Sequence, residues 1–236
     1  DFWYDIYPNM LFYAIGERYP DVEGVNDIML HVAERFTAAD SVIMSTVGNY
    51  RLREFDFGNM QPGNREKMVQ SDAAAGFAYV LYGAWRKYGN VRYLQAALSA
   101  MNALDAETES QFYEVIMPFA VYMAARMNAE QGTSYDVGKF LEWTFNGQSK
   151  ARPGWGVLTG NFGGYAVDGL CGSVSEEYAF AMNSFALAWP LLPAVRYDQS
   201  LARAVGRWAV NAAGNARYFY PQYVEPSHQS LTDVSL

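Results

Sequence analysis

Hydrophobic positions along the chain recur with helical periodicity in two forms that alternate. In one form a single apolar stripe faces polar residues, as at Ile28, Val32 and Phe36. In the other form nearly every position is apolar and many residues are small, as in residues 73–85, which read AAAGFAYVLYGAW. A helix with one stripe lies at a surface, whereas a helix that is apolar all round is buried on every side. The alternation therefore predicts inner and outer helices that follow one another along the chain.

This pattern predicts helices in four successive hairpins. We expect them near 8–19, 23–38, 71–88, 91–106, 112–131, 136–146, 176–192 and 198–215. Asp136 and Asp198 each precede a helical run, where a side-chain oxygen can cap free backbone N–H groups. The expected fold is all-α, a partial (α/α) toroid in which residues 1–236 form a single domain. A complete ring of six hairpins would need two more, so the chain could be an excerpt of a longer protein.

Two segments, 47–69 and 147–175, are longer than a helical hairpin needs. In the first, residues 50–57 suit one strand of a small β-hairpin near 47–60. The second contains eight glycines. Long irregular segments in a compact helical domain are commonly functional, so we expect binding residues in them.

Composition and charge limit the kinds of partner and cofactor. The net charge is −8, from 17 basic and 25 acidic residues, and no Lys/Arg run interrupts this balance, which argues against nucleic acid. No stretch of 18 apolar residues occurs, so we expect no membrane span. A single cysteine, Cys171, excludes an internal disulfide. One cysteine and two histidines also make a poor zinc site, and we expect neither a metal nor a cofactor. The aromatic share of 16% suits both a packed helical core and a cleft that stacks on sugar rings.

Carboxylates recur at the beginnings of the predicted inner helices. Asp72, Glu114, Glu176 and Glu177 stand there, and Asp5 lies just ahead of the first helix. Because the inner helices of a toroid run the same way, their N-termini share one rim, where these acids would converge. Glycoside cleavage uses such a pair, with one carboxyl protonated and one ionised. The free N–H groups and the helix dipole also explain the acids without catalysis, and they lower the pKa of an acid.

The glycine-rich segment supplies further candidates. Asp168 is free of a helix dipole and is a candidate proton donor, although Asp before Gly169 is also a common turn pair. Trp155 and Tyr165 are candidate sugar platforms, or else rings that anchor the segment in the core. The candidate substrate-binding residues are Asp5, Tyr7, Tyr113, Arg152, Trp155, Asn161, Tyr165, Tyr178 and His228.

These features resemble the six-hairpin glycosidase superfamily. The resemblance rests on the alternating hairpins and on Ser71-Asp72-Ala73-Ala74-Ala75-Gly76, Tyr113-Glu114-Val115 and Arg152-Pro153-Gly154-Trp155-Gly156. It covers most of residues 5–220 as architecture, without the signature of one family, and the helix count departs from the family pattern. It implies a carbohydrate substrate and, because such proteins are commonly bacterial and often secreted, a secreted or periplasmic location.

The first functional expectation is a glycoside hydrolase that acts on an oligo- or polysaccharide. Its acid and its base or nucleophile would come from the carboxylates Asp72, Glu114, Asp168, Glu176 and Glu177.

Two other functions fit the same residues. A polysaccharide lyase would remove a proton beside a uronate carboxylate, and its candidate base and neutralising residues are Tyr113, Tyr165, His228, Arg152 and Asn161. A non-catalytic domain would bind glycan or act as a scaffold, with other domains of the same polypeptide as partners.

Overall fold

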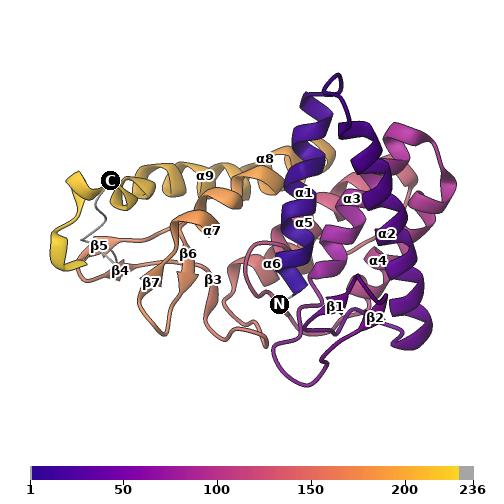
Figure 1. The fold of residues 1–236 in the computed structure, drawn as a ribbon. Coiled ribbons are helices and arrows are strands. Elements are labelled where there is room, and N and C mark those ends of the chain that lie inside the picture. Colours follow the sequence, from indigo (N-terminus) through magenta and orange to yellow (C-terminus); the bar gives the residue numbers. More distant parts are fainter. Residues whose placement is uncertain (1, 229–236) are drawn as a thin grey trace.

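The computed structural model describes residues 2–228 and is about 60% helical, which confirms the predicted all-α class (Figure 1). The helices are α1 (Phe2–Arg18), α2 (Val25–Thr46), α3 (Ala73–Tyr88), α4 (Val91–Asp105), α5 (Met117–Gln131), α6 (Val137–Phe145), α7 (Ala181–Ala186), α8 (Ala188–Tyr197) and α9 (Ala202–Asn215). The short 3-10 turns are η1 (Gln199–Leu201), η2 (Ala216–Phe219), η3 (Pro221–Tyr223) and η4 (Pro226–His228). Within residues 2–228, no helix combines the length and apolar character that crossing a bilayer requires.

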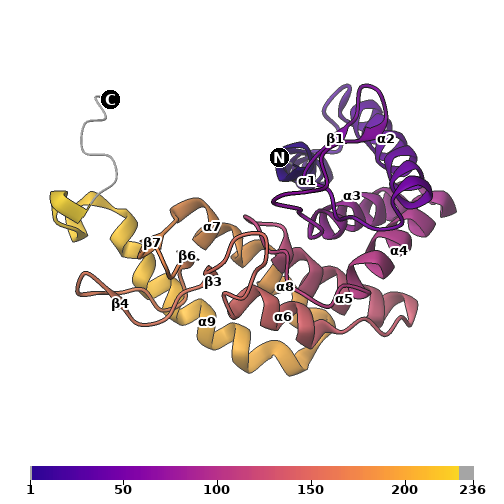
Figure 2. The ribbon, with the colours of Figure 1, turned by 90° about the horizontal axis from the view of Figure 1, so that it is seen from below.

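The helices pack in two layers, in the order expected of successive hairpins. Helices α1, α3, α5 and α8 contact one another in turn, while α2 and α4 pack behind α3, α6 packs on α5 and α9 on α8. Figure 2 shows this row bending, with α2, α4, α6 and α9 on its outer side. The inner helices meet around four rings, and the rings of Tyr7 in α1 and Trp189 in α8 lie 6.1 Å apart. Tyr79 and Phe119 complete this cluster from α3 and α5.

Local residue choices explain the hairpins. Gly89 ends α3 with a φ of 71°, which costs glycine little, and the Asn90 side chain then caps α4 by accepting from the Arg92 N–H. Asp136 and Asp198 cap the following turns, as predicted. In α3, a Cβ at Gly76 would overlap the Ile6 side chain of α1. The small residues of α3 therefore allow the two inner helices to approach closely.

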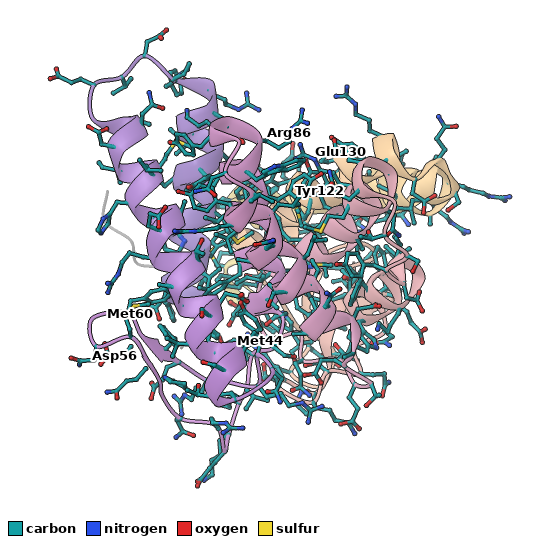
Figure 3. All side chains as sticks on the ribbon, turned by 90° about the vertical axis from the view of Figure 1, so that its right-hand side faces the viewer. Met44, Asp56, Met60, Arg86, Tyr122 and Glu130 are labelled. Atoms are coloured by element: carbon teal, nitrogen blue, oxygen red, sulfur yellow. The ribbon has the colours of Figure 1, made fainter. Side chains whose placement is uncertain are left out.

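The inner helices point the same way. The Trp3 N–H donates to Gln70 Oε1 at 2.9 Å, which joins the beginning of α1 to the residues just before α3. At the opposite end, the Tyr82 hydroxyl of α3 donates to Glu130 Oε2 of α5 at 2.7 Å. In Figure 3, Glu130 lies at the end of the molecule opposite Asp56 of the small β-hairpin. The shared N-terminal end that the sequence predicts is therefore present for α1, α3 and α5.

Both long segments contain strands. In the first, β1 (Phe55–Asp56) pairs antiparallel with β2 (Gln61–Pro62), so the hairpin expected near 47–60 forms with very short strands. In the second, β3 (Trp155–Val157), β6 (Cys171–Ser173) and β7 (Tyr178–Ala179) form an antiparallel sheet in the order β3-β6-β7. Beside it, β4 (Asn161–Phe162) pairs with β5 (Tyr165–Ala166). The glycine-rich segment is therefore built as small sheets and turns.

The predicted helix over 176–192 is wrong at its beginning. Strand β7 takes Tyr178 and Ala179 into the sheet, and α7 begins only at Ala181. Glycine at 172 makes this pairing close, because a Cβ there would overlap the Tyr178 carbonyl. Glu177 turns the chain with a φ of 47°, a left-handed conformation that is uncommon for residues other than glycine.

The helices predicted over 8–19 and 112–131 also begin elsewhere. Helix α1 starts at Phe2 and continues through Pro8, while α5 starts at Met117, with Pro118 in its first turn.

Candidate active site

Asp72 and Glu114 lie together at the N-terminal end of the inner helices, as the sequence predicts. Asp72 occupies the cap position of α3, and its Oδ2 accepts from the Tyr113 N–H at 3.5 Å. Glu114 lies in the segment that leads into α5, and its charge acts on the Asp72 carboxyl. The two acids therefore lie near each other, joined through the backbone of Tyr113, which directly precedes Glu114.

Glu114 is held by residues from two other elements. Arg152 Nη1 donates to Oε1 at 2.6 Å, and the Asn183 amide of α7 donates to Oε2 at 3.0 Å. The Trp155 indole N–H donates to the Glu114 carbonyl at 3.1 Å. The Arg152 guanidinium lies over the Trp155 ring, 3.5 Å from its centre. We refer to Asp72, Glu114, Arg152, Trp155 and Asn183 as the acid cluster.

Burial shifts the titration of both acids in the same direction. It raises the pKa of Asp72 to about 7, because the carboxyl is almost fully removed from solvent; backbone N–H groups, with that of Tyr113 foremost, oppose the shift. Burial also raises the pKa of Glu114, while Arg152 and Asn183 act in the opposite direction. The lowering expected from helix N-termini is therefore outweighed by burial. Near neutral pH, Asp72 holds a proton for much of the time, while Arg152 favours the ionised form of Glu114.

Buried polar atoms without a hydrogen-bond partner gather at this same end. Within residues 2–228 they are Trp3 Nε1, Gln70 Nε2, Ser71 Oγ, Asp72 Oδ1 and Asn183 Oδ1. Such an atom costs ~1–3 kcal/mol, and folded proteins rarely keep several without a reason. The set mixes donors, acceptors and groups that can be either. A ligand with many hydroxyl groups, each both donor and acceptor, would complement it.

Other predicted binding residues near this end have different surroundings. The Tyr113 ring lies 5.9 Å from the Arg152 guanidinium, at the edge of the acid cluster. Trp155 is fully buried, so it anchors its segment in the core and offers no open platform. Tyr7 is buried in the aromatic cluster between the inner helices. Asp5 lies on the exposed side of the first turns of α1.

The expected convergence of the inner-helix acids on one rim is wrong for Glu176 and Glu177, and Asp168 of the glycine-rich segment is bonded within its own turn. Glu176 and Glu177 form the exposed turn between β6 and β7, because the sheet pairing displaces the helix start. Asp168 lies in the turn after β5, where Oδ1 accepts from the Gly160 N–H at 3.0 Å and the carbonyl accepts from Asn215 at 2.9 Å. These contacts give Asp168 a structural role in its turn.

The remaining candidate binding residues lie in or near the small sheets that also carry Asp168, Glu176 and Glu177. Asn161 is in β4, and Tyr165 and Tyr178 line a cavity together with Glu177. His228 ends η4, four residues after Val224, which also lines this cavity.

Several residues of this site are not predicted from the sequence. Gln70 and Ser71 precede Asp72 directly, and their buried polar atoms mark them only once the fold is known. The sequence does offer one indication of Asn183, because this polar residue stands inside the largely apolar run YAFAMNSFALAW. Trp3 lies before the helix that the sequence predicts to begin at residue 8.

No cluster of three or more His, Cys, Asp or Glu side chains suited to a metal ion occurs within residues 2–228. In comparisons with known proteins, no protein-family model, no curated protein and no solved structure matches this chain.

Proposed function

We propose that the chain is one wall of an (α/α) toroid and that its acid cluster cleaves a glycosidic bond. The observation that carries this proposal is the pairing of Asp72, a buried acid whose pKa is about 7, with Glu114, a carboxylate held by Arg152. Glycoside hydrolysis requires this division between a proton donor and an ionised partner. The common direction of α1, α3 and α5 and the bending row of inner helices support the toroid.

Each residue then has a defined part in the reaction. The Asp72 carboxyl gives its proton to the glycosidic oxygen as the bond between that oxygen and the anomeric carbon breaks. In a direct displacement, water adds to the anomeric carbon and Glu114 takes its proton. If Glu114 has first formed a covalent bond to the sugar, water breaks that bond and gives its proton to the ionised Asp72 carboxylate. Arg152 and Asn183 are positioning residues, since they hold the Glu114 carboxylate and do not act on the sugar.

Substrate must displace side chains that cover the acids. Asp72 is 1% exposed, whereas the Arg152 side chain is 29% exposed and Tyr113 is half-buried. The glycan therefore reaches Asp72 when the Tyr113 side chain moves outward, while Arg152 continues to hold Glu114. Unpartnered polar atoms at Gln70 and Ser71 then gain hydroxyl partners from the sugar. A polymeric substrate of this kind is consistent with a secreted or periplasmic protein.

A polysaccharide lyase is the second candidate, because Tyr113 lies beside the Arg152 guanidinium. This pair supplies a base and a cation. It is the weaker candidate, since Arg152 is already paired with Glu114 and burial raises the pKa of Tyr113, which disfavours its deprotonated form. Lyase products absorb ultraviolet light at their new double bond, and hydrolase products do not.

The experiment is an incubation of the purified chain with a panel of neutral and uronate-containing glycans, with release of reducing ends and ultraviolet absorbance measured together. We expect reducing ends without new absorbance. Asp72→Asn should reduce turnover by about 10²–10⁴-fold, the contribution of a general acid, while glycan binding is retained.

Asp40→Asn is the matched control. Asp40 is also a buried acid with a raised pKa, of about 6 because of burial, and it is bonded to Tyr50 and Ser99 away from the acid cluster. Its variant should keep wild-type turnover. Absence of turnover on every glycan, or equal loss in both variants, would overturn the proposal and favour a non-catalytic domain.

A further inference from the structure

A second group of predicted residues surrounds a cavity of about 570 Å³ beside the small sheets. Its aromatic lining residues are Phe162, Tyr165, Tyr178, Phe180, Tyr218 and Phe219. Among the described lining residues Glu177 is the only charged one. The volume falls within the ~300–1,000 Å³ that is typical of sites for small ligands.

The rings of this cavity hold one another in place. Tyr165 and Tyr218 meet edge to face with their centres 5.2 Å apart, and Tyr178 stacks on Phe180 at 5.9 Å. Arg217 donates to the Tyr218 hydroxyl at 2.8 Å and so fixes that ring further. Walls that are ordered before binding lower the entropic cost of holding a ligand.

The chemistry of the lining selects a class of ligand. Ring faces pack on the C–H faces of a sugar, and the Glu177 carboxylate and the Tyr178 hydroxyl can bond to its hydroxyl groups. The one charged side chain among the described lining residues is the Glu177 carboxylate, and the adjacent Arg217 is already bonded to the Tyr218 hydroxyl. A phosphate, sulfate or uronate would therefore meet a like charge in the lining. The cavity therefore suits a neutral saccharide.

The cavity and the acid cluster share the beginning of α7. Phe180 and Ala181 line the cavity, while Asn183 donates to Glu114. From Phe180 to Asn183 the chain advances three residues, ~4.5 Å along a helix axis. We propose that the cavity is a subsite that binds neutral sugar units of the same glycan whose bond the acid cluster cleaves. This inference rests on the proposed function.

The test compares neutral oligosaccharides of increasing length by calorimetric titration of the full chain and by turnover. Phe162→Ala and Tyr178→Ala should each weaken the binding of long oligosaccharides about tenfold, the effect of losing one stacking ring. Glu177→Gln should have a smaller effect of the same sign. Turnover of a short aryl glycoside, which occupies only the acid cluster, should be unchanged in all three variants.

Tyr220→Ala is the matched control, because Tyr220 is 54% exposed and lines a separate cavity beside α9. It should bind every oligosaccharide as wild type does. If wild type cleaves glycans but binds long oligosaccharides no more tightly than Phe162→Ala and Tyr178→Ala do, the subsite is overturned and the proposed role of the acid cluster is not. The subsite proposal would also be overturned if the cavity bound an anionic uronate oligosaccharide, or the quaternary ammonium cation choline, more tightly than a neutral sugar. Absence of both binding and cleavage in wild type would instead overturn the proposed function.

Discussion

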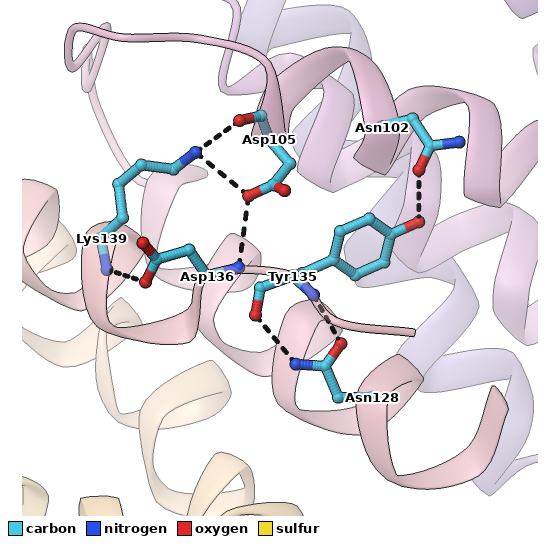
Figure 4. Close-up of polar contacts among 6 residues, drawn as sticks. All are labelled: Asn102, Asp105, Asn128, Tyr135, Asp136 and Lys139. Carbon is cyan, nitrogen blue, oxygen red and sulfur yellow. Dashed lines mark hydrogen bonds and ion pairs between the residues drawn. The ribbon is translucent and has the colours of Figure 1, made fainter. Parts of the chain in front are cut away.

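The two ends of α5 place polar side chains in opposite situations. At the C-terminal end, the turn into α6 forms a closed network (Figure 4). Asn128 accepts from the Tyr135 N–H at 2.8 Å and donates to the Tyr135 carbonyl at 2.9 Å. The Tyr135 hydroxyl donates to Asn102 at 2.9 Å, and Lys139 pairs with Asp105 at 3.1 Å.

At the N-terminal end the polar groups are more deeply buried and less completely paired. Asp72 and Asn183 each keep one unpartnered oxygen, and the Ser71 hydroxyl has no partner. The first arrangement stabilises a turn. The second reduces stability, and proteins accept such a cost mainly where a site must be ready for a ligand. The difference separates polar residues that maintain a turn from polar residues whose capacity for hydrogen bonds is not used within the described chain.

The largest expected effect is the pH dependence of stability caused by Asp72. Its folded pKa of about 7 exceeds the value near 3.9 in an unfolded chain, so between these values the folded state binds more protons. Stability must therefore fall as pH rises from about 4 to 7, by on the order of 4 kcal/mol for this group. Urea unfolding at several pH values gives the free energy of unfolding as a function of pH. In Asp72→Asn, the fall of this free energy between pH 4 and 7 should be smaller by that amount.

Asp40→Asn calibrates that experiment, because burial raises the pKa of Asp40 only to about 6. Its variant should lose a smaller part of the slope, confined to the range between pH 4 and 6. A slope that is the same in wild type and Asp72→Asn would show that Asp72 titrates normally and that the two ends of α5 do not differ in this way.

A second effect should follow from removing the partner of Glu114. Arg152→Met leaves a carboxylate that is 13% exposed without its cation, which should destabilise the protein by about 3 kcal/mol at neutral pH. Adding Glu114→Gln should restore part of the loss, because the unpaired charge is then gone. Equal stability of Arg152→Met and wild type in urea would mean that the pair does not hold the site.

A smaller pair of substitutions compares the two ends directly. Asn128→Ala removes two bonds to Tyr135 and leaves the Tyr135 N–H unpaired, whereas the Tyr135 carbonyl still accepts from the Val137 N–H, so the substitution should cost about 2 kcal/mol. Ser71→Ala removes a hydroxyl that has no partner and should leave stability unchanged or raise it by up to about 1 kcal/mol. Thermal and urea unfolding of the two variants under one condition measures both. Similar losses in the two variants would remove the contrast.

The parts of this site that the sequence predicts depend on local pattern. Helical periodicity predicts inner and outer helices, and a common direction of the inner helices brings Asp72 and Glu114 together at one end. The expected helical position of Glu176 and Glu177 is wrong, because the pairing of β6 with β7 depends on close backbone contact at Gly172, which local periodicity does not reveal. The sequence also does not predict the direction of the pKa shifts, because burial depends on the whole fold and outweighs the helix dipole.

The central claim is that Asp72 carries a proton near neutral pH beside an ionised Glu114. Carboxyl ¹³C chemical shifts of Asp72, assigned by comparison with Asp72→Asn and followed from low to high pH, test it most directly. We predict a midpoint of about 7 for Asp72. A midpoint near 4 for Asp72, or protonation of Glu114 while Asp72 is ionised, would contradict the account.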